Sequence, residues 1–136
     1  MTFALDPRLA ADTLDVGDLS LSRALLMNDA RFPWLILVPR RAGLTEIFDL
    51  DRAQRGVLMD EIALASNALH ALSNVDKINV GALGNIVRQL HVHIVGRKIG
   101  DAAWPGPVWG GGAAQRYDEG AGAELIERIR RGLALV

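Results

Sequence analysis

Two of the chain's three histidines stand two residues apart, in the segment Gln89-Leu90-His91-Val92-His93-Ile94-Val95. Polar and apolar residues alternate through this segment, which predicts a β-strand with Gln89, His91 and His93 on one face. At about 3.3 Å per residue the two histidine backbones lie about 6.6 Å apart, so both rings can reach one phosphoryl group. A buried sheet would explain the apolar face of this strand, but it would not explain a polar row on the other face.

Imidazole suits phosphoryl transfer because its ordinary pKa of about 6.5 leaves it mostly neutral at pH 7. One ring nitrogen can attack phosphorus when a carbonyl or carboxylate holds the other nitrogen protonated. We therefore predict His91 as the nucleophile. We expect His93 to hydrogen-bond a phosphoryl oxygen or, when charged, to stabilise the transition state or protonate the leaving group. The loop from Gly81 to Asn85 can aim backbone N–H groups at a phosphate, although no Gly-Lys-Ser/Thr follows and it is not a P-loop.

The elements that position these residues can be predicted from local patterns. Asp6 and Pro7 suit the cap and first position of a short helix, and apolar residues at helical spacing predict one long helix from Asp51 to about Leu72. The remaining predicted elements are a hairpin of strands at 19–27 and 34–38 around the turn at 28–31, a strand at 77–80, the histidine strand, and a helix at about 122–133. This order indicates an α+β fold with a mainly antiparallel sheet of about five strands, one long helix and a C-terminal helix.

Composition limits the protein's class and its partners. A length of 136 residues, 50% of them hydrophobic and 23% charged, predicts one globular domain over residues 1–136, with a Gly- and Pro-rich surface loop at 99–122. The formal net charge of −1 means that the chain has no excess of positive charge to attract nucleic acid or anionic lipid. Without cysteine there is no disulfide, thiolate nucleophile or Cys-ligated zinc. Because we see no secretory signal and no spanning apolar run, we expect a cytoplasmic, soluble protein.

The segment GNIVRQLHVHIVGR resembles the signature of the histidine triad (HIT) superfamily, His-φ-His-φ-His-φ-φ after a Gly-Gln-Ser/Thr-Val-type stretch. In this match His91 takes the position of the nucleophilic middle histidine and His93 that of the third, while Gln89 replaces the first. Gly84 matches the glycine before the triad, and Asn85 stands where a phosphate-contacting glutamine is common. The similarity covers most of residues 20–98, leaving 99–136 as the loop and the C-terminal helix.

A second part of the resemblance lies upstream, where Asn28 precedes the apolar run Trp34-Leu35-Ile36-Leu37-Val38-Pro39. It is similar to the family's ribose-binding Asp or Asn ahead of an apolar strand that ends in Pro. The resemblance implies a nucleotide site with contacts from Asn28, Gly84, Asn85 and Gln89. Asn79 is expected either to orient the phosphate loop or simply to belong to an edge strand.

The resemblance also implies an activity. A homodimer would cleave a nucleoside 5′-phosphoryl bond of a small-molecule nucleotide through a covalent nucleotidyl-histidine, without a metal or other cofactor. The substrate would be a phosphoramidate, a dinucleoside polyphosphate or a nucleotidyl adduct. Gln89 cannot become an imidazolium, so an acid or charge role of the first histidine is lost. The alternative is therefore a weakly active or non-catalytic nucleotide-binding module.

Simpler interpretations exist for several of these residues. The histidine pair could be a surface pair, or it could bind zinc, but zinc needs a third ligand and His70 is distant in sequence. His70 is more simply a residue at the end of the long helix, where its charge suits the helix dipole. We expect Trp104 and Trp109 in the core or a dimer interface before a ligand site, although either could stack on a base. Arg88 and Arg97 bracket the histidine strand and could attract polyphosphate, but we expect both to be solvated.

Overall fold

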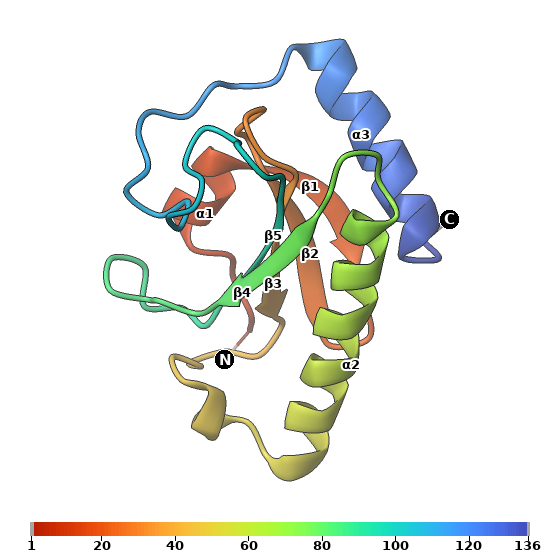
Figure 1. Ribbon diagram of the computed structural model, residues 1–136. Helices are drawn as coiled ribbons and strands as arrows, with labels where there is room; N and C mark the ends of the chain where they lie inside the picture. The colour runs from red at the N-terminus through yellow and green to blue at the C-terminus, as the bar shows by residue number, and fades with distance from the viewer. Residues whose placement is uncertain (1, 136) are drawn as a thin grey trace.

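The computed structural model describes residues 2–135, and its centre is a five-stranded sheet with the strand order β1-β2-β3-β5-β4 (Figure 1). Each neighbouring pair of strands is antiparallel. The elements are α1 (Pro7–Asp12), β1 (Thr13–Asp18), β2 (Ser22–Met27), β3 (Trp34–Pro39), the 3-10 helix η1 (Ile47–Asp49), α2 (Arg52–His70), β4 (Lys77–Gly81), β5 (Val92–Arg97) and α3 (Glu119–Gly132). The predicted α+β class, with one long helix and a C-terminal helix, is confirmed.

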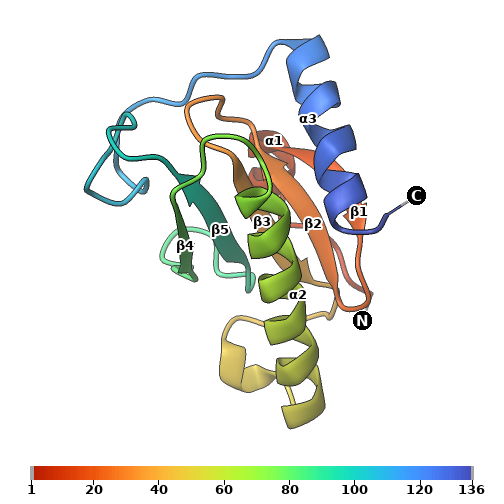
Figure 2. The same cartoon turned by 45° about the vertical axis from the view of Figure 1, so that its right-hand side comes forward.

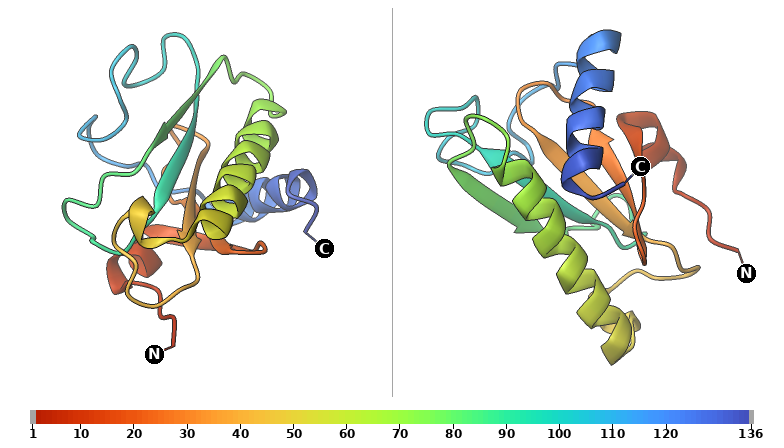
Figure 3. Two further views of the ribbon diagram at one scale, coloured as in Figure 1. Left: turned by 90° about the horizontal axis from the view of Figure 1, so that it is seen from below. Right: turned by 90° about the vertical axis from the view of Figure 1, so that its right-hand side faces the viewer.

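Side-chain alternation along β3 divides the apolar core into two clusters, one on each face of the sheet. Leu35 and Leu37 belong to the cluster under α2 and α3, whereas Trp34, Ile36 and Val38 belong to the cluster on the opposite face. α2 packs on β3, β4 and β5, and α3 packs on β1 and α2. Figures 2 and 3 show both helices on one side of the sheet and the long connection of residues 98–118 on the other.

The long helix α2 forms where the apolar spacing predicts it. Asp51 is its N-cap and accepts a hydrogen bond of 2.8 Å from the backbone N–H of Gln54. Glu61 is buried on the inner face of the helix, where its carboxylate accepts the backbone N–H groups of Leu21 and Ser22 at 2.8 and 3.0 Å. A buried carboxylate needs such partners, so Glu61 ties α2 to the turn between β1 and β2.

Most other predicted elements are present, with shifted boundaries. The hairpin of β2 and β3 and the short helix α1 behind its cap Asp6 are confirmed, and α3 begins at Glu119, ahead of the predicted start. β1 and η1 are not predicted by the local pattern, because the Asp and Gly residues of β1 disfavour a strand. β5 begins at Val92, so Gln89 lies before the strand and not within it. None of the helices within residues 2–135 has the length and apolar character needed to cross a membrane.

The expectation that Arg97 is solvated is wrong. Its side chain is the largest one that is fully buried among the described residues, with only 1% of the residue exposed. Two of its nitrogens each donate at 2.8 Å to the Asp101 carboxylate, and a third donates at 2.9 Å to Oδ1 of Asn79. Hydrogen bonding from Arg97 lowers the pKa of Asp101 to about 2. The ion pair with Asp101 and the hydrogen bond to Asn79 offset the cost of burying this charge at the end of β5.

Candidate active site

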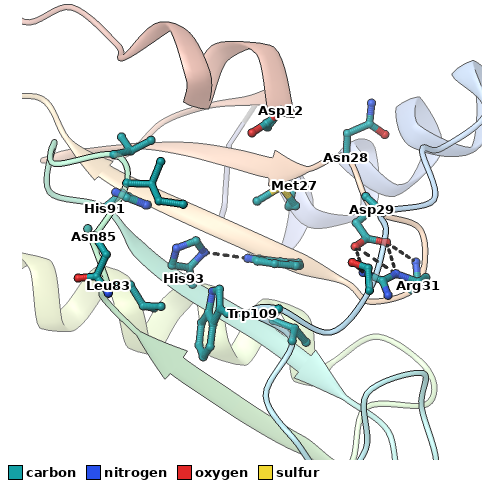
Figure 4. A pocket seen from close by; sticks show the side chains of 18 of the residues that line it. Asp12, Met27, Asn28, Asp29, Arg31, Leu83, Asn85, His91, His93 and Trp109 are labelled. Carbon is teal, nitrogen blue, oxygen red and sulfur yellow. Dashed lines mark hydrogen bonds and ion pairs between the residues drawn. The ribbon is translucent and has the colours of Figure 1, made fainter.

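A cavity of about 590 Å³ opens on the face of the sheet that carries Trp34 and His93, a size that suits a small-molecule ligand. Its walls come from the end of β2 and the following turn, the loop at 83–87, the start of β5, and the Gly-rich loop at 108–116. Figure 4 shows His91, Asn85 and Leu83 at one end, and Asn28, Asp29 and Arg31 at the other. Among the predicted site residues, those that line the cavity are Asn28, Gly84, Asn85, His91 and His93.

His91 is buried just before β5, with its ring turned so that Nδ1 lies 2.7 Å from the backbone carbonyl oxygen of Gln89. A carbonyl oxygen can only accept a hydrogen bond, so Nδ1 carries the proton. In the neutral ring, Nε2 keeps its lone pair. This is the tautomer that a histidine nucleophile requires, and a backbone carbonyl supplies the orienting partner.

His93 has the opposite tautomer. The indole N–H of Trp34 donates to Nδ1 of His93 at 3.0 Å, and since indole nitrogen is only a donor, the proton of His93 lies on Nε2. Burial, and to a smaller extent the neighbouring His91, lowers the pKa of His93 to about 4, so the ring is neutral at pH 7. The two histidine rings are 4.9 Å apart between centroids. One ring thus presents a lone pair and the other an N–H.

Trp109 forms the wall beside His93, with their ring centroids 5.4 Å apart in an edge arrangement. The close approach of this indole depends on Gly81, because a Cβ there would lie 2.9 Å from the ring. Trp109 thus packs against the second core cluster, as expected first, and also lines the cavity, where the expected alternative would place it. Trp104 is 37% exposed and its ring lies 5.7 Å from the Arg97 guanidinium carbon.

The far end of the cavity holds an ion pair that local patterns do not reveal. Arg31 donates to both carboxylate oxygens of Asp29, the closest contact being 2.8 Å, and also to the carbonyl of Gly111 at 2.8 Å. Burial raises the pKa of Asp29, but hydrogen bonds from Arg31 and from the backbone of Gln115 outweigh burial and leave the pKa below its ordinary value. The pair therefore connects the turn after β2 to the Gly-rich loop.

Two further features complete the two ends of the cavity. Oδ1 of Asn28 accepts the backbone N–H of Tyr117 at 2.8 Å, so the C-terminal part of the chain holds this side chain in place. Gly84 has a φ of +72°, in the left-handed region that glycine adopts without strain. The predicted glycine-dependent bend in the loop before the histidines is therefore present.

The structure places Asn79 and Gln89 outside the cavity. Asn79 bonds to Arg97, whereas Oε1 of Gln89 accepts the backbone N–H of Asp6 and its Nε2 donates to the carbonyl of Ala4, each at 2.9 Å. His70 lies in the last turn of α2 with its side chain exposed. Within residues 2–135 no three His, Asp or Glu side chains form a group that could hold a metal ion.

Comparison with known proteins agrees with this geometry. A histidine triad protein from Bradyrhizobium japonicum is 48% identical, with 98% of this chain and 99% of that chain covered and a TM-score of 0.95. A histidine triad (HIT) protein from Sinorhizobium meliloti 1021 is 47% identical over 96% of this chain and 97% of that chain, with a TM-score of 0.94. A histidine triad protein from Marinobacter aquaeolei VT8 is 44% identical over 98% of each chain, with a TM-score of 0.95. No curated protein matches the chain. The family model described as HIT domain matches residues 9–100, and the chain belongs to this family.

Proposed function

We propose that this protein is a nucleotidyl hydrolase or transferase that cleaves a nucleoside 5′-phosphoryl bond through a covalent nucleotidyl intermediate on His91. The observation that carries the proposal is the pair of opposite tautomers in one cavity: a lone pair on Nε2 of His91 beside an N–H on Nε2 of His93. A nucleophile next to a neutral hydrogen-bond donor is what attack on a phosphoryl group needs.

The proposed reaction has two displacements at phosphorus. In the first, the lone pair on Nε2 of His91 forms a bond to phosphorus, and the bond to the leaving group breaks with its electron pair. The leaving group then takes a proton from solvent, while neutral His93 donates a hydrogen bond from Nε2 to a phosphoryl oxygen. The carbonyl of Gln89 stabilises the charge that develops on the His91 ring, because it accepts the Nδ1 hydrogen. In the second displacement, the oxygen of water or of another acceptor forms a bond to phosphorus and loses its proton to solvent, while the bond between phosphorus and Nε2 breaks and returns the electron pair to the nitrogen.

The rest of the cavity gives the nucleotide an orientation. Asn85 shares the end of the cavity with His91, and Gly84 lines the cavity next to Asn85 in the chain, so we assign both to the phosphate. Asn28 lies at the opposite end, where its fixed side chain suits contact with the ribose. We propose that Asn79 and Gln89 support the site from outside the cavity and make no direct contact with the nucleotide.

We also propose that the enzyme works in the cytoplasm without a cofactor, and that its partner is a second copy of the chain. The free edge of the sheet supports self-association, because β4 pairs with β5 on one side only. Val80 on this edge is 49% exposed, and Met59 on α2 is also exposed. Sedimentation at micromolar concentration would show a dimer, and a monomer at every concentration would refute this part of the proposal.

The activity is tested by incubating the protein with an adenylyl phosphoramidate and measuring intact mass after a quench that avoids acid. We expect a nucleotidyl adduct or turnover in the wild type and neither in His91→Ala. His70→Ala is the matched control, because His70 is an exposed histidine away from the cavity and its loss should leave turnover unchanged. Nucleotide binding with equally negligible turnover in the wild type and His91→Ala would refute the enzyme and indicate a binding module. A dinucleoside polyphosphate in parallel reactions would identify the leaving group.

A further inference from the structure

Gln89 does not line the cavity although it lies two positions before His91; it lines a smaller neighbouring cavity of about 150 Å³, which Gly84 and His91 also line. We propose that Gln89 is a positioning residue: it clasps the N-terminal segment at Ala4 and Asp6, and this contact holds the carbonyl that orients the His91 ring. The proposal rests on the proposed function of His91, and it assigns a role in catalysis to the N-terminal segment.

The clasp consists of two hydrogen bonds across a long stretch of chain. The Gln89 carboxamide accepts from the N–H of Asp6 and donates to the carbonyl of Ala4, both at 2.9 Å. A donor and an acceptor that flank one residue of an extended chain form the pattern of a parallel β-ladder step. The side-chain amide of Gln89 therefore takes the place of a backbone peptide group beside residue 5.

The N-terminal segment is itself well anchored, so it can serve as a fixed support. Phe3 and Leu5 pack against the second core cluster. Asp6 caps α1 by accepting the backbone N–H of Arg8 at 2.8 Å. The two groups that hold Gln89 therefore lie between an apolar anchor and a capped helix.

Residues 89–91 depend on such supports because β5 begins only at Val92. The backbone N–H of Leu90 donates to the carbonyl of Leu44 at 3.0 Å, and the Gln89 clasp provides the other attachment of this segment. The backbone carbonyl of Gln89 is the acceptor for Nδ1–H of His91 at 2.7 Å. The same residue thus holds the N-terminal segment with its side chain and the nucleophile with its main chain.

If the two hydrogen bonds of the Gln89 side chain only stabilise the fold, removing them leaves the His91 tautomer unchanged. If they position His91, removing them changes the tautomer. In Gln89→Ala we expect about a thirtyfold slower single-turnover formation of the nucleotidyl adduct, the scale expected for losing two ordinary hydrogen bonds. Nitrogen-15 NMR of His91 should show a mixture of the two neutral tautomers in place of one. Gln89→Glu should behave similarly, because an ionised carboxylate cannot donate to the Ala4 carbonyl.

Gln54→Ala is the matched control, since Gln54 also bonds a backbone N–H with its side chain but lines no part of the cavity. It should lower the thermal midpoint about as much as Gln89→Ala while leaving adduct formation and the His91 tautomer unchanged. If either Gln89 variant folds and keeps the wild-type rate and the single tautomer, the clasp does not position His91. If the wild type forms no adduct, the proposed function fails, and the NMR comparison still decides on the clasp alone.

Discussion

Lowering the pH from 7 to 5 should destabilise the folded protein by about 2 kcal/mol through His93 alone. The folded-state pKa of His93 is about 4, mainly because of burial and further because of His91, compared with an ordinary value of 6.5. The unfolded chain therefore binds a proton below pH 6.5, whereas the folded protein does so only near pH 4. Between these values the unfolded state holds more protons, so the free energy of unfolding falls as the pH falls, and the loss is complete below pH 4.

Urea unfolding at several pH values from 7 to 5 measures this effect, with His93→Gln as the comparison. Glutamine does not titrate, so the difference in unfolding free energy between the wild type and the variant should shrink by about 2 kcal/mol over this range. Asp101 and Asp29, with pKa values at about 2 and below 3.8, titrate below this window. A difference that stays constant from pH 7 to 5, or an NMR titration of His93 near pH 6.5, would refute the reasoning.

Two further substitutions test other parts of the structure. Asp101→Asn should lower the free energy of unfolding, measured in urea, by about 3 kcal/mol, because Arg97 would keep a buried charge without its ion pair. Asp18→Asn, which removes an exposed ion pair with Arg23, should lower it by less than about 1 kcal/mol. Equal effects of the two substitutions would contradict the burial of the Arg97–Asp101 pair. Trp34→Phe removes the donor to Nδ1 of His93, so nitrogen-15 NMR should show both tautomers of that ring and adduct formation should slow by about tenfold. An unchanged tautomer would mean that Trp34 does not orient His93.

The sequence by itself determined the class of fold, the order of most elements and the histidine pair. These features depend on short-range patterns: a cap at Asp51 followed by helical spacing, an apolar run at 34–38, and alternation around His91 and His93. A period of about two or 3.6 residues is visible within one segment, because neighbouring side chains determine which face an element buries. The resemblance to the histidine triad family, which the family model confirms, comes from the same local stretch.

Only the tertiary structure decided how the site is oriented, because its controlling contacts join residues far apart in the chain. The Trp34 indole that sets the His93 tautomer lies 59 positions away in sequence, and Gln89 reaches Ala4 across 85 positions. Arg97 is buried because Asn79 and Asp101 converge on it, although a strand-end arginine ordinarily faces solvent. A local pattern carries no information about which distant donor meets which acceptor, and such a pairing gives His93 its tautomer, whereas His91 takes its tautomer from the carbonyl of Gln89 two positions away.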